Sequence, residues 1–139
     1  MRNPDPEKVA VAVLIVEDEF LLRMDAASFI EDAGFLVYEA ENADEAIRVL
    51  ERHPEIRFVF TDVNMPGSMD GLKLAHYVRG RWPPVKIIIA SGLVHLREED
   101  LPAGAVFVKK PYHPRHITST CGKCCYESRA IRIPPAQSV

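Results

Sequence analysis

Continuous apolar runs alternate with segments of helical apolar period along this 139-residue chain. Residues 9–16 are a continuous apolar run rich in β-branched side chains, typical of a strand covered on both faces. In the next segment the period changes, and apolar residues recur at helical spacing: Leu22, Ala26, Phe29, Ile30 and Ala33. Gly34 stands where the residue after a helix belongs. The pattern predicts a strand and then a helix that ends before Gly34.

The following residues continue this alternation. Further strands are predicted over residues 35–40, 57–61, 85–90 and 105–108. Asn42, with Glu45 three residues later, resembles a capping box, and His53-Pro54 ends the helix that it begins. Asp70 begins another helix, over residues 72–78. Residues 94–101 form at most a short helix stopped by Pro102, and a helix over 113–125 is weakened by Pro114 and Gly122.

Strands that alternate with helices over short connections predict one fold class. It is a doubly wound α/β domain with a five-stranded parallel sheet and helices on both faces. We expect this domain to span residues 9–120, with an N-terminal extension at 1–8 and a loosely ordered tail at 121–139. A chain of this length can bury roughly two-thirds of the surface that its unfolded form exposes, so it can form a stable core without disulfides or a structural metal.

Composition narrows the setting in which the protein works. The net charge of −3 predicts no global attraction to nucleic acid or to an anionic membrane. No apolar stretch reaches the roughly 18 residues that a membrane helix needs, and the N-terminal region makes a poor signal peptide. The three cysteines all lie between residues 121 and 125, which fits a reducing compartment. We therefore expect a cytoplasmic protein.

Charged and polar residues stand at the end of four predicted strands. Glu17-Asp18 follows the first, Asp62 the third, Ser91-Gly92 the fourth and Lys109-Lys110 the fifth. In an open α/β sheet, ligands bind at the carboxyl ends of the strands, near the point where the strand order reverses. We therefore expect three carboxylates, a hydroxyl and one or two ammonium groups at one edge of the sheet.

This set of residues predicts phosphoryl chemistry at a magnesium site. Clustered carboxylates repel one another, and Mg²⁺ is the usual compensating cation. Asp18 and Asp62 would bind it, the backbone carbonyl of Asn64 could add an oxygen, and Glu17 could hold a metal-bound water. A carboxylate can attack phosphorus once the transferring charge is neutralised, which the cation, a lysine and the Ser91 hydroxyl would achieve.

Each of these residues also has an ordinary structural explanation. Glu17-Asp18 could simply cap a helix, Ser91-Gly92 and Asp62 could be turn residues, and Lys109-Lys110 could be a solvated strand end. Four independent coincidences at four strand ends are harder to obtain than one site. The joint placement therefore favours the functional interpretation.

The motifs at these positions resemble one known family, the receiver domain of two-component response regulators, over roughly residues 11–117. They are Leu14-Ile15-Val16-Glu17-Asp18-Glu19, Thr61-Asp62-Val63-Asn64-Met65-Pro66-Gly67, Met69-Asp70-Gly71-Leu72, Ala90-Ser91-Gly92, and Gly104-Ala105 through Phe107 to Lys110-Pro111-Tyr112. The resemblance implies a flavodoxin-like fold. It also implies Mg²⁺-dependent transfer of a phosphoryl group to Asp62 from a sensor histidine kinase or a histidine phosphotransfer protein.

The resemblance also assigns roles to individual residues. Asp62 matches the phosphoacceptor, and Glu17 and Asp18 match the acidic pair at the metal. Ser91 matches the hydroxyl that moves to the phosphoryl group, and Phe107 the aromatic ring that changes rotamer with it. Lys110 is a better match than Lys109 to the family's lysine, because it directly precedes a proline. Asn64 lies two residues beyond the acceptor, where the family tunes hydrolysis.

Three features depart from the commonest family pattern. Gly67-Ser68-Met69 makes the loop after the acceptor one residue longer. No effector module follows the domain in this sequence, so we expect a stand-alone receiver that signals to a downstream protein by contact. The weak last helix leaves open a monomer or a phosphorylation-dependent dimer. Cys121, Cys124 and Cys125 with His113 and His116 could recruit Zn²⁺, although ordinary thiols on a tail explain them better.

Three other functions stay open at the level of the sequence. The protein could be a phosphate sink that only drains a kinase, or a constitutive interaction module. It could also be a phosphohydrolase with an aspartate nucleophile, but that chemistry needs a second Asp two residues after the nucleophile, where this chain has Asn64. We therefore do not expect a conventional enzyme, only a protein that catalyses its own phosphorylation and dephosphorylation.

Overall fold

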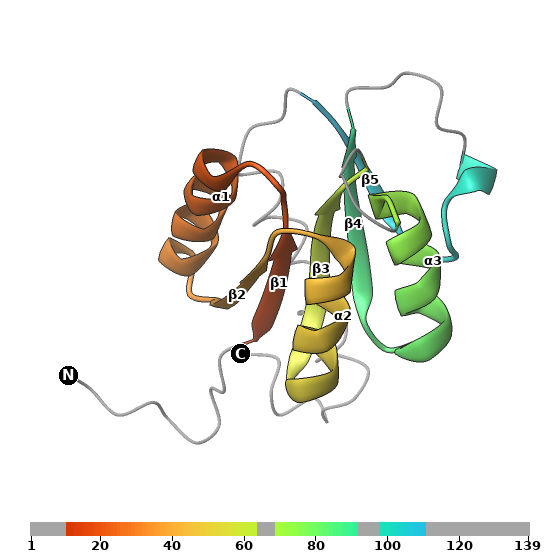
Figure 1. Cartoon of the computed structure of the whole chain (residues 1–139), viewed down its shortest axis with the longest axis horizontal. Coiled ribbons are helices and arrows are strands. Elements are labelled where there is room, and N and C mark those ends of the chain that lie inside the picture. Colours follow the sequence, from red (N-terminus) through yellow and green to blue (C-terminus); the bar gives the residue numbers. More distant parts are fainter. Residues whose placement is uncertain (1–10, 64–68, 92–97, 111–139) are drawn as a thin grey trace, which may run out of the picture.

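Five parallel strands form one sheet at the centre of the molecule (Figure 1). They are β1 (Ala12–Val16), β2 (Leu36–Ala40), β3 (Ile56–Asp62), β4 (Lys86–Ser91) and β5 (Val106–Lys109). Their order in the sheet is β2-β1-β3-β4-β5. These elements come from a computed structural model that describes residues 11–63, 69–91 and 98–110. The strand order reverses between β1 and β3, which creates a crevice at their carboxyl ends.

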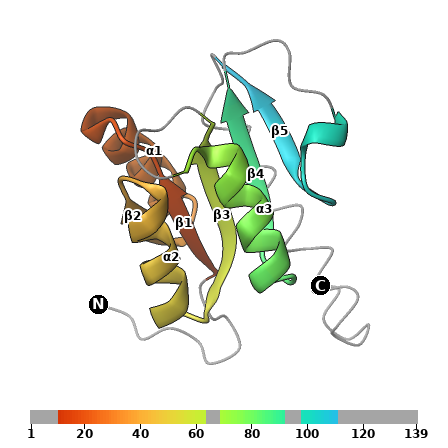
Figure 2. The same ribbon diagram turned by 45° about the vertical axis from the view of Figure 1, so that its right-hand side comes forward.

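Helices cover both faces of the sheet, as predicted. They are α1 (Phe20–Asp32), α2 (Ala43–Arg52) and α3 (Gly71–Arg81), and a short 3₁₀ helix, η1 (Glu98–Asp100), precedes β5. Figures 1 and 2 show α2 and α3 side by side along one face, with α1 on the other. Together these elements confirm the flavodoxin-like, doubly wound class.

The central strand β1 feeds two separate cores, because its side chains alternate between the faces of the sheet. Val13 and Ile15 pack on the face that α1 covers, against Ala27 and Ile30. The other β1 side chains pack on the opposite face, with buried residues of α2 and α3: Ala12, Leu14 and Val16. All five residues of the strand are buried. This double coverage explains why its sequence is continuously apolar.

Local signals set the starts of α2 and α3 and the end of α1 where the sequence predicts them, although α3 runs to Arg81, beyond the predicted range 72–78. Asn42 caps α2, accepting from the backbone N–H of Glu45 at 2.8 Å, and Asp70 caps α3, accepting from that of Lys73 at 2.9 Å. The carboxylate of Glu45 accepts from the backbone N–H of Glu41 rather than from that of the cap residue. Gly34 has φ +100°, a conformation that favours glycine after a helix.

The helical stripe in α1 differs from its buried face. Leu22 is 47% and Phe29 39% exposed, whereas the buried residues of the helix are Ala27 and Ile30. A short helix is expected within residues 94–101. Residues 92–97 lie outside the described part of the chain, and the remainder contains the 3₁₀ helix η1. The helix considered over 113–125, the cysteine group and the proposed terminal segments also lie outside the described residues.

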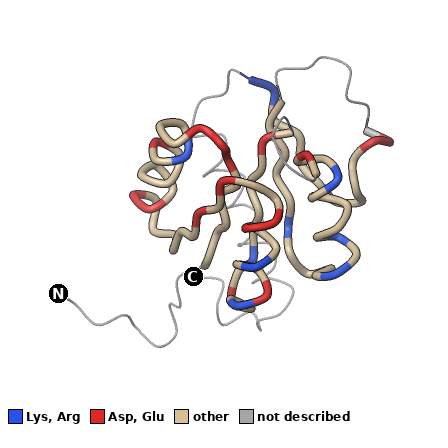
Figure 3. Tube along the Cα trace, viewed as in Figure 1, with Lys and Arg blue, Asp and Glu red and all other residues tan. Residues whose placement is uncertain are grey.

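Charge is distributed unevenly over the fold. Figure 3 shows acidic residues around the connection from β1 to α1, and basic residues toward the carboxyl ends of α2 and α3. These acidic residues lie at the carboxyl edge of the sheet, where the sequence predicts a site.

Within the described part of the chain, no helix is long and apolar enough to cross a membrane.

Candidate functional site

Asp62, the last residue of β3, forms an ion pair with a lysine. Its Oδ2 atom accepts a hydrogen bond from Nζ of Lys110 at 2.8 Å. The side chain of Asp62 is 11% exposed and that of Lys110 31% exposed. The pair is therefore partly withdrawn from water, where its attraction is less screened than at the open surface.

Sheet register brings these two residues together. β4 lies between β3 and β5, pairing Asp62 with Ala90 and Ser91 with Lys109. Beyond the strand ends, the backbone N–H of Val63 donates to the carbonyl of Ala90 at 3.0 Å, and that of Lys110 to the carbonyl of Ser91 at 2.8 Å. The backbone of Lys110 is thus anchored on β4, and its side chain reaches across the end of that strand.

Two further carboxylates come from the connection between β1 and α1. Val16 on β1 lies opposite Thr61 on β3. The residues that follow them, Glu17 and Asp62, are therefore neighbours. Glu17 is buried, and its Oε2 atom accepts from the backbone N–H of Glu19 at 3.2 Å, which turns the carboxylate back over the loop. Asp18 is exposed. Carboxylate oxygens of Glu17, Asp18 and Asp62 all lie within 4.8 Å of one another.

Burial disfavours the ionised form of the Glu17 side chain and so raises its pKa. The pKa of Glu17 is raised from 4.5 to about 7, mainly by desolvation on burial. The hydrogen bond with Asp18 and the charge of Asp62 also raise it, while the backbone hydrogen bond from Glu19 and the charge of Lys110 lower it. A cation among the three carboxylates would favour the ionised form of all of them. Three converging carboxylate oxygens fit a hard divalent cation such as Mg²⁺.

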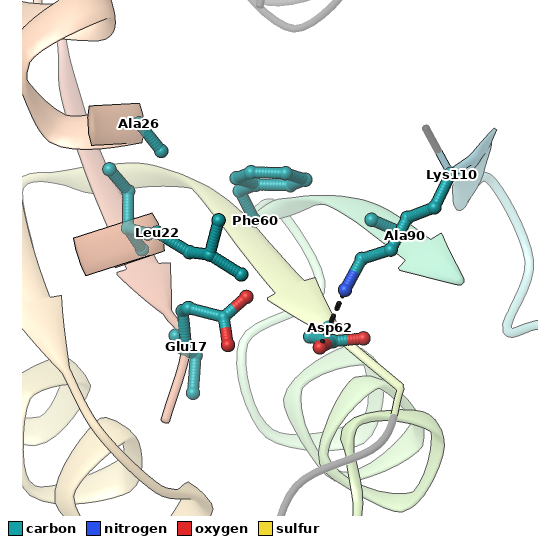
Figure 4. A pocket seen from close by; sticks show the side chains of 9 residues that line it. Glu17, Leu22, Ala26, Phe60, Asp62, Ala90 and Lys110 are labelled. Atoms are coloured by element: carbon teal, nitrogen blue, oxygen red, sulfur yellow. Dashed lines mark hydrogen bonds and ion pairs between the residues drawn. The ribbon is translucent and has the colours of Figure 1, made fainter. Parts of the chain in front are cut away.

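The pocket around these groups has one polar and one apolar side. Figure 4 shows the carboxylates of Glu17 and Asp62 and the ammonium group of Lys110 together on the polar side. The apolar residues that line the pocket include Leu22, Ala26, Phe60 and Ala90. Leu22 and Ala26 come from α1, so this helix forms a wall of the pocket as well as covering the sheet.

The structure brings together most of the residues that the sequence singles out. Ser91 is fully buried at the end of β4, next to the anchored backbone of Lys110. Phe107 lies half-buried on β5, opposite Ile89. Lys109 is exposed. Asn64 lies outside the described residues.

Sequence reasoning missed Arg23, on the first turns of α1. Its Nη1 atom donates to the backbone carbonyl of Glu17 at 2.8 Å, and its Nε atom donates to Oε1 of Glu39 at 3.1 Å. An arginine near the start of an amphipathic helix looks like an ordinary solvated residue. Only its place five residues after Asp18 hinted at a connection with the acidic loop.

Known proteins match the chain in sequence. It is 34% identical over 115 residues to the sensor kinase CckA of Brucella abortus, covering 80% of this chain and 12% of that protein. It is 34% identical over 114 residues to the hydrogenase transcriptional regulatory protein HoxA of Cupriavidus necator, covering 78% of this chain and 23% of that protein. The chain thus spans less than a quarter of the length of either of these relatives.

Solved structures match the fold. A response regulator receiver protein from Sinorhizobium medicae superposes with a TM-score of 0.75 at 28% sequence identity, covering 82% of this chain and 93% of that one. The family model described as the response regulator receiver domain matches residues 13–121. The acidic pocket and the lysine described above lie within this range. The chain therefore belongs to the receiver domain family of two-component response regulators.

Proposed function

We propose that Asp62 accepts a phosphoryl group from a phosphohistidine on a sensor histidine kinase or a histidine phosphotransfer protein. The observation that carries the proposal is the arrangement around this one carboxylate. Asp62 lies within 2.8 Å of the ammonium group of Lys110 and in a cluster with Glu17 and Asp18. Receiver domains are signalling modules rather than conventional enzymes, and the proposed reaction changes the protein itself.

The covalent step is a phosphoryl transfer between two nucleophiles. A carboxylate oxygen of Asp62 attacks phosphorus, an O–P bond forms, and the N–P bond to the donor imidazole breaks with its electron pair returning to nitrogen. Lys110 already donates to Asp62 Oδ2, so a short movement of its ammonium group would bring it to a phosphoryl oxygen. The lysine thereby compensates charge before and after transfer.

The acidic cluster would hold the required cation. Asp18 and Asp62 would bind Mg²⁺ through carboxylate oxygens, Glu17 through a bound water, and we propose the backbone carbonyl of Asn64 as a further ligand. When bound, Mg²⁺ neutralises charge on the transferring phosphoryl group. Glu17 and Asp18 contribute by keeping this charge compensation next to Asp62.

The switch would use residues at the ends of β4 and β5. Ala90 on β4 is the sheet partner of Asp62, and Ser91 is the next residue along β4. The Ser91 residue therefore lies close to the acceptor. We propose that the Ser91 hydroxyl binds a phosphoryl oxygen and that Phe107 on β5 changes rotamer with it. A local charge change would then be reported to a downstream protein at the surface near β4 and β5.

Exposed apolar residues beside the pocket support contact with a protein donor. Four of them lie at the start of α1: Phe20, Leu21, Leu22 and Met24. Leu22 also lines the pocket, so a partner that binds these residues would lie next to Asp62. Exposed apolar groups beside a reactive site suit a protein partner better than a small substrate.

The test is phosphorylation by small donors, read as intact mass. Acetyl phosphate and phosphoramidate, which has a P–N bond, would each be incubated with the protein and Mg²⁺. We expect one phosphoryl group to be gained, and none in Asp62→Ala or after removal of Mg²⁺ by a chelator. The matched control is Asp25→Ala, which removes an exposed carboxylate from α1.

Three results would contradict parts of the proposal. Unchanged labelling in Asp62→Ala would place the acceptor elsewhere. A phosphorylated form that binds candidate partners no more tightly than the unphosphorylated form would leave only a phosphate sink. Steady-state hydrolysis of simple phosphate esters, lost in Asp62→Asn, would instead indicate a phosphohydrolase.

A further inference from the structure

Arg23 joins three separate segments of the chain beside the acidic cluster. It lies on α1, and its side chain is only 12% exposed, so most of it is withdrawn from solvent. One guanidinium nitrogen donates to the backbone carbonyl of Glu17 at 2.8 Å, and another donates to the Glu39 carboxylate, near the end of β2, at 3.1 Å. The guanidinium carbon lies 5.5 Å from the centre of the Phe20 ring.

We propose that Arg23, held by Glu39, is a positioning residue that fixes the acidic loop and thereby sets the affinity of the site for a divalent cation. This inference rests on the proposed function, because it concerns the same cation. Arg23 would touch neither the cation nor the phosphoryl group. It would act through the backbone of Glu17.

The geometry holds the residue Glu17 from both of its peptide groups. Its backbone N–H donates to the carbonyl of Ala40 at 3.0 Å, at the end of β2, and its carbonyl accepts from Arg23. Because both peptide planes are anchored, the backbone of Glu17 and the direction of its Cα–Cβ bond are set before a cation binds. Without the second anchor, repulsion among the carboxylates would be free to turn the loop outward.

The partner of Arg23 explains why its guanidinium stays in place. Glu39 is 43% exposed and lies on the edge strand β2, while Arg23 itself is nearly covered. A charge-assisted bond at the edge and a bond to a backbone carbonyl use two nitrogens of the same planar group. This arrangement resembles the outer-shell contacts that orient metal-binding carboxylates in other proteins.

The sign of the effect separates positioning from simple charge. The guanidinium is positive, so its field opposes the binding of a second cation nearby. If Arg23 acted only through its charge, Arg23→Met would bind Mg²⁺ more tightly. If it positions the loop, the same substitution weakens binding.

The experiment is a calorimetric Mg²⁺ titration of the full chain. We expect a roughly tenfold weaker Kd in Arg23→Met and a smaller loss in Arg23→Lys, which can reach only one of the two partners. Glu39→Ala should weaken binding too, and the double variant Arg23→Met with Glu39→Ala should be no weaker than Arg23→Met alone. The control Arg48→Met removes an exposed positive charge from α2, on the other face of the sheet.

A second measurement needs no cation. The backbone N–H of Glu19 donates to the carboxylate of Glu17 at 3.2 Å. We expect hydrogen exchange at this amide to be faster in Arg23→Met and in Glu39→Ala, and unchanged in Arg48→Met. If Arg23→Met does not fold, Glu39→Ala and Arg23→Lys provide the same comparison at the opposite end of the contact and with the charge retained.

The outcomes are distinguishable. Wild-type protein that binds no Mg²⁺ would overturn the proposed site and this inference together. Wild-type binding with an equal or tighter Kd in Arg23→Met would overturn the inference alone, as would an equal loss in Arg48→Met. Weaker binding that saturating Mg²⁺ overcomes, with phosphorylation then restored to the wild-type extent, would support positioning.

Discussion

The two edges of the sheet carry ion pairs of different kinds. At the carboxyl edge, Lys110 and Asp62 meet at 2.8 Å with side chains 31% and 11% exposed. Away from it, Arg81 at the end of α3 meets Glu51 of α2 at 3.5 Å, with side chains 55% and 46% exposed. Water screens the second pair, whereas partial burial makes the first sensitive to the loss of either member. Charge therefore matters to this fold mainly where it is withdrawn from solvent.

The largest expected difference between the two edges is steric. Gly71 begins α3 at the carboxyl edge, where its N–H donates to the carbonyl of Val63 at 2.8 Å and an added Cβ would lie 1.8 Å from the carbonyl oxygen of Asp62. We expect Gly71→Ala to lower the free energy of unfolding by about 3–5 kcal/mol, measured by urea denaturation. Gly80, near the other end of α3, has nothing within 4 Å of an added Cβ. Gly80→Ala should stabilise the protein by up to about 1 kcal/mol, and equal losses in both variants would contradict this account.

Removing the partly buried ammonium group of Lys110 should have the next largest effect. Lys110→Met leaves the carboxylate of Asp62 in the acidic cluster without its 2.8 Å partner. We expect the metal-free protein to lose about 1–3 kcal/mol of unfolding free energy, and phosphorylation by acetyl phosphate to slow about 100-fold. Lys109→Met, which changes the exposed neighbouring lysine, is the control. If both substitutions slow phosphorylation equally, the assignment of Lys110 is wrong.

Glu17 predicts a pH dependence of moderate size. Its pKa in the folded protein is raised to about 7 from 4.5, chiefly by burial, so the folded state binds this proton more tightly than the unfolded state. The resulting stabilisation is present below pH 4.5 and is lost as the pH rises through 7. In the absence of metal, Glu17→Gln should therefore be more stable than wild type at pH 8, by about 1 kcal/mol or more, and gain less at pH 5.

Unfolding measured at several pH values, with a chelator present, tests this expectation. The exposed Glu51→Gln is the control for removing one carboxylate. A stability difference that does not grow between pH 5 and pH 8, or that grows equally in the control, would show that the burial of Glu17 does not govern it.

The smallest effect is expected at the exposed pair. Arg81→Met removes the 3.5 Å contact with Glu51. The guanidinium also lies 5.5 Å from the Trp82 ring, and the methionine retains part of that packing. We expect a change of less than about 0.5 kcal/mol in unfolding free energy and an unchanged rate of phosphorylation. A loss comparable to that of Lys110→Met would remove the contrast between the two pairs.

Local signals made much of the architecture predictable. The caps at Asn42 and Asp70 and the turn at Gly34 depend on backbone groups within four residues, so they are legible in a short window of sequence. The strand ends next to Glu17, Asp62, Ser91 and Lys110 could also be predicted from the sequence. Parallel strands put their carboxyl ends at one edge, whatever their order, so the edge could be predicted without knowing which strands are neighbours.

Other features could not be predicted in this way. The apolar spacing of α1 indicates a helix, but not that Leu22 would be 47% exposed while lining the pocket. That outcome depends on where the helix lies against the sheet. The residues of the tail and of the loop after Asp62, including Asn64, lie outside the described structure, so their expected roles stay predictions.

The sequence by itself determined the fold class, the ends of most elements and the kinds of residue gathered at one edge of the sheet, because these follow from local backbone preferences and from the geometry of parallel strands. Only the tertiary structure decided which residues touch. Lys110 reaches Asp62 because β4 separates their strands in a particular register, and Arg23 reaches Glu39 because β2 lies beside β1. Side-chain contacts between distant segments depend on strand order and register, which no short window of sequence contains.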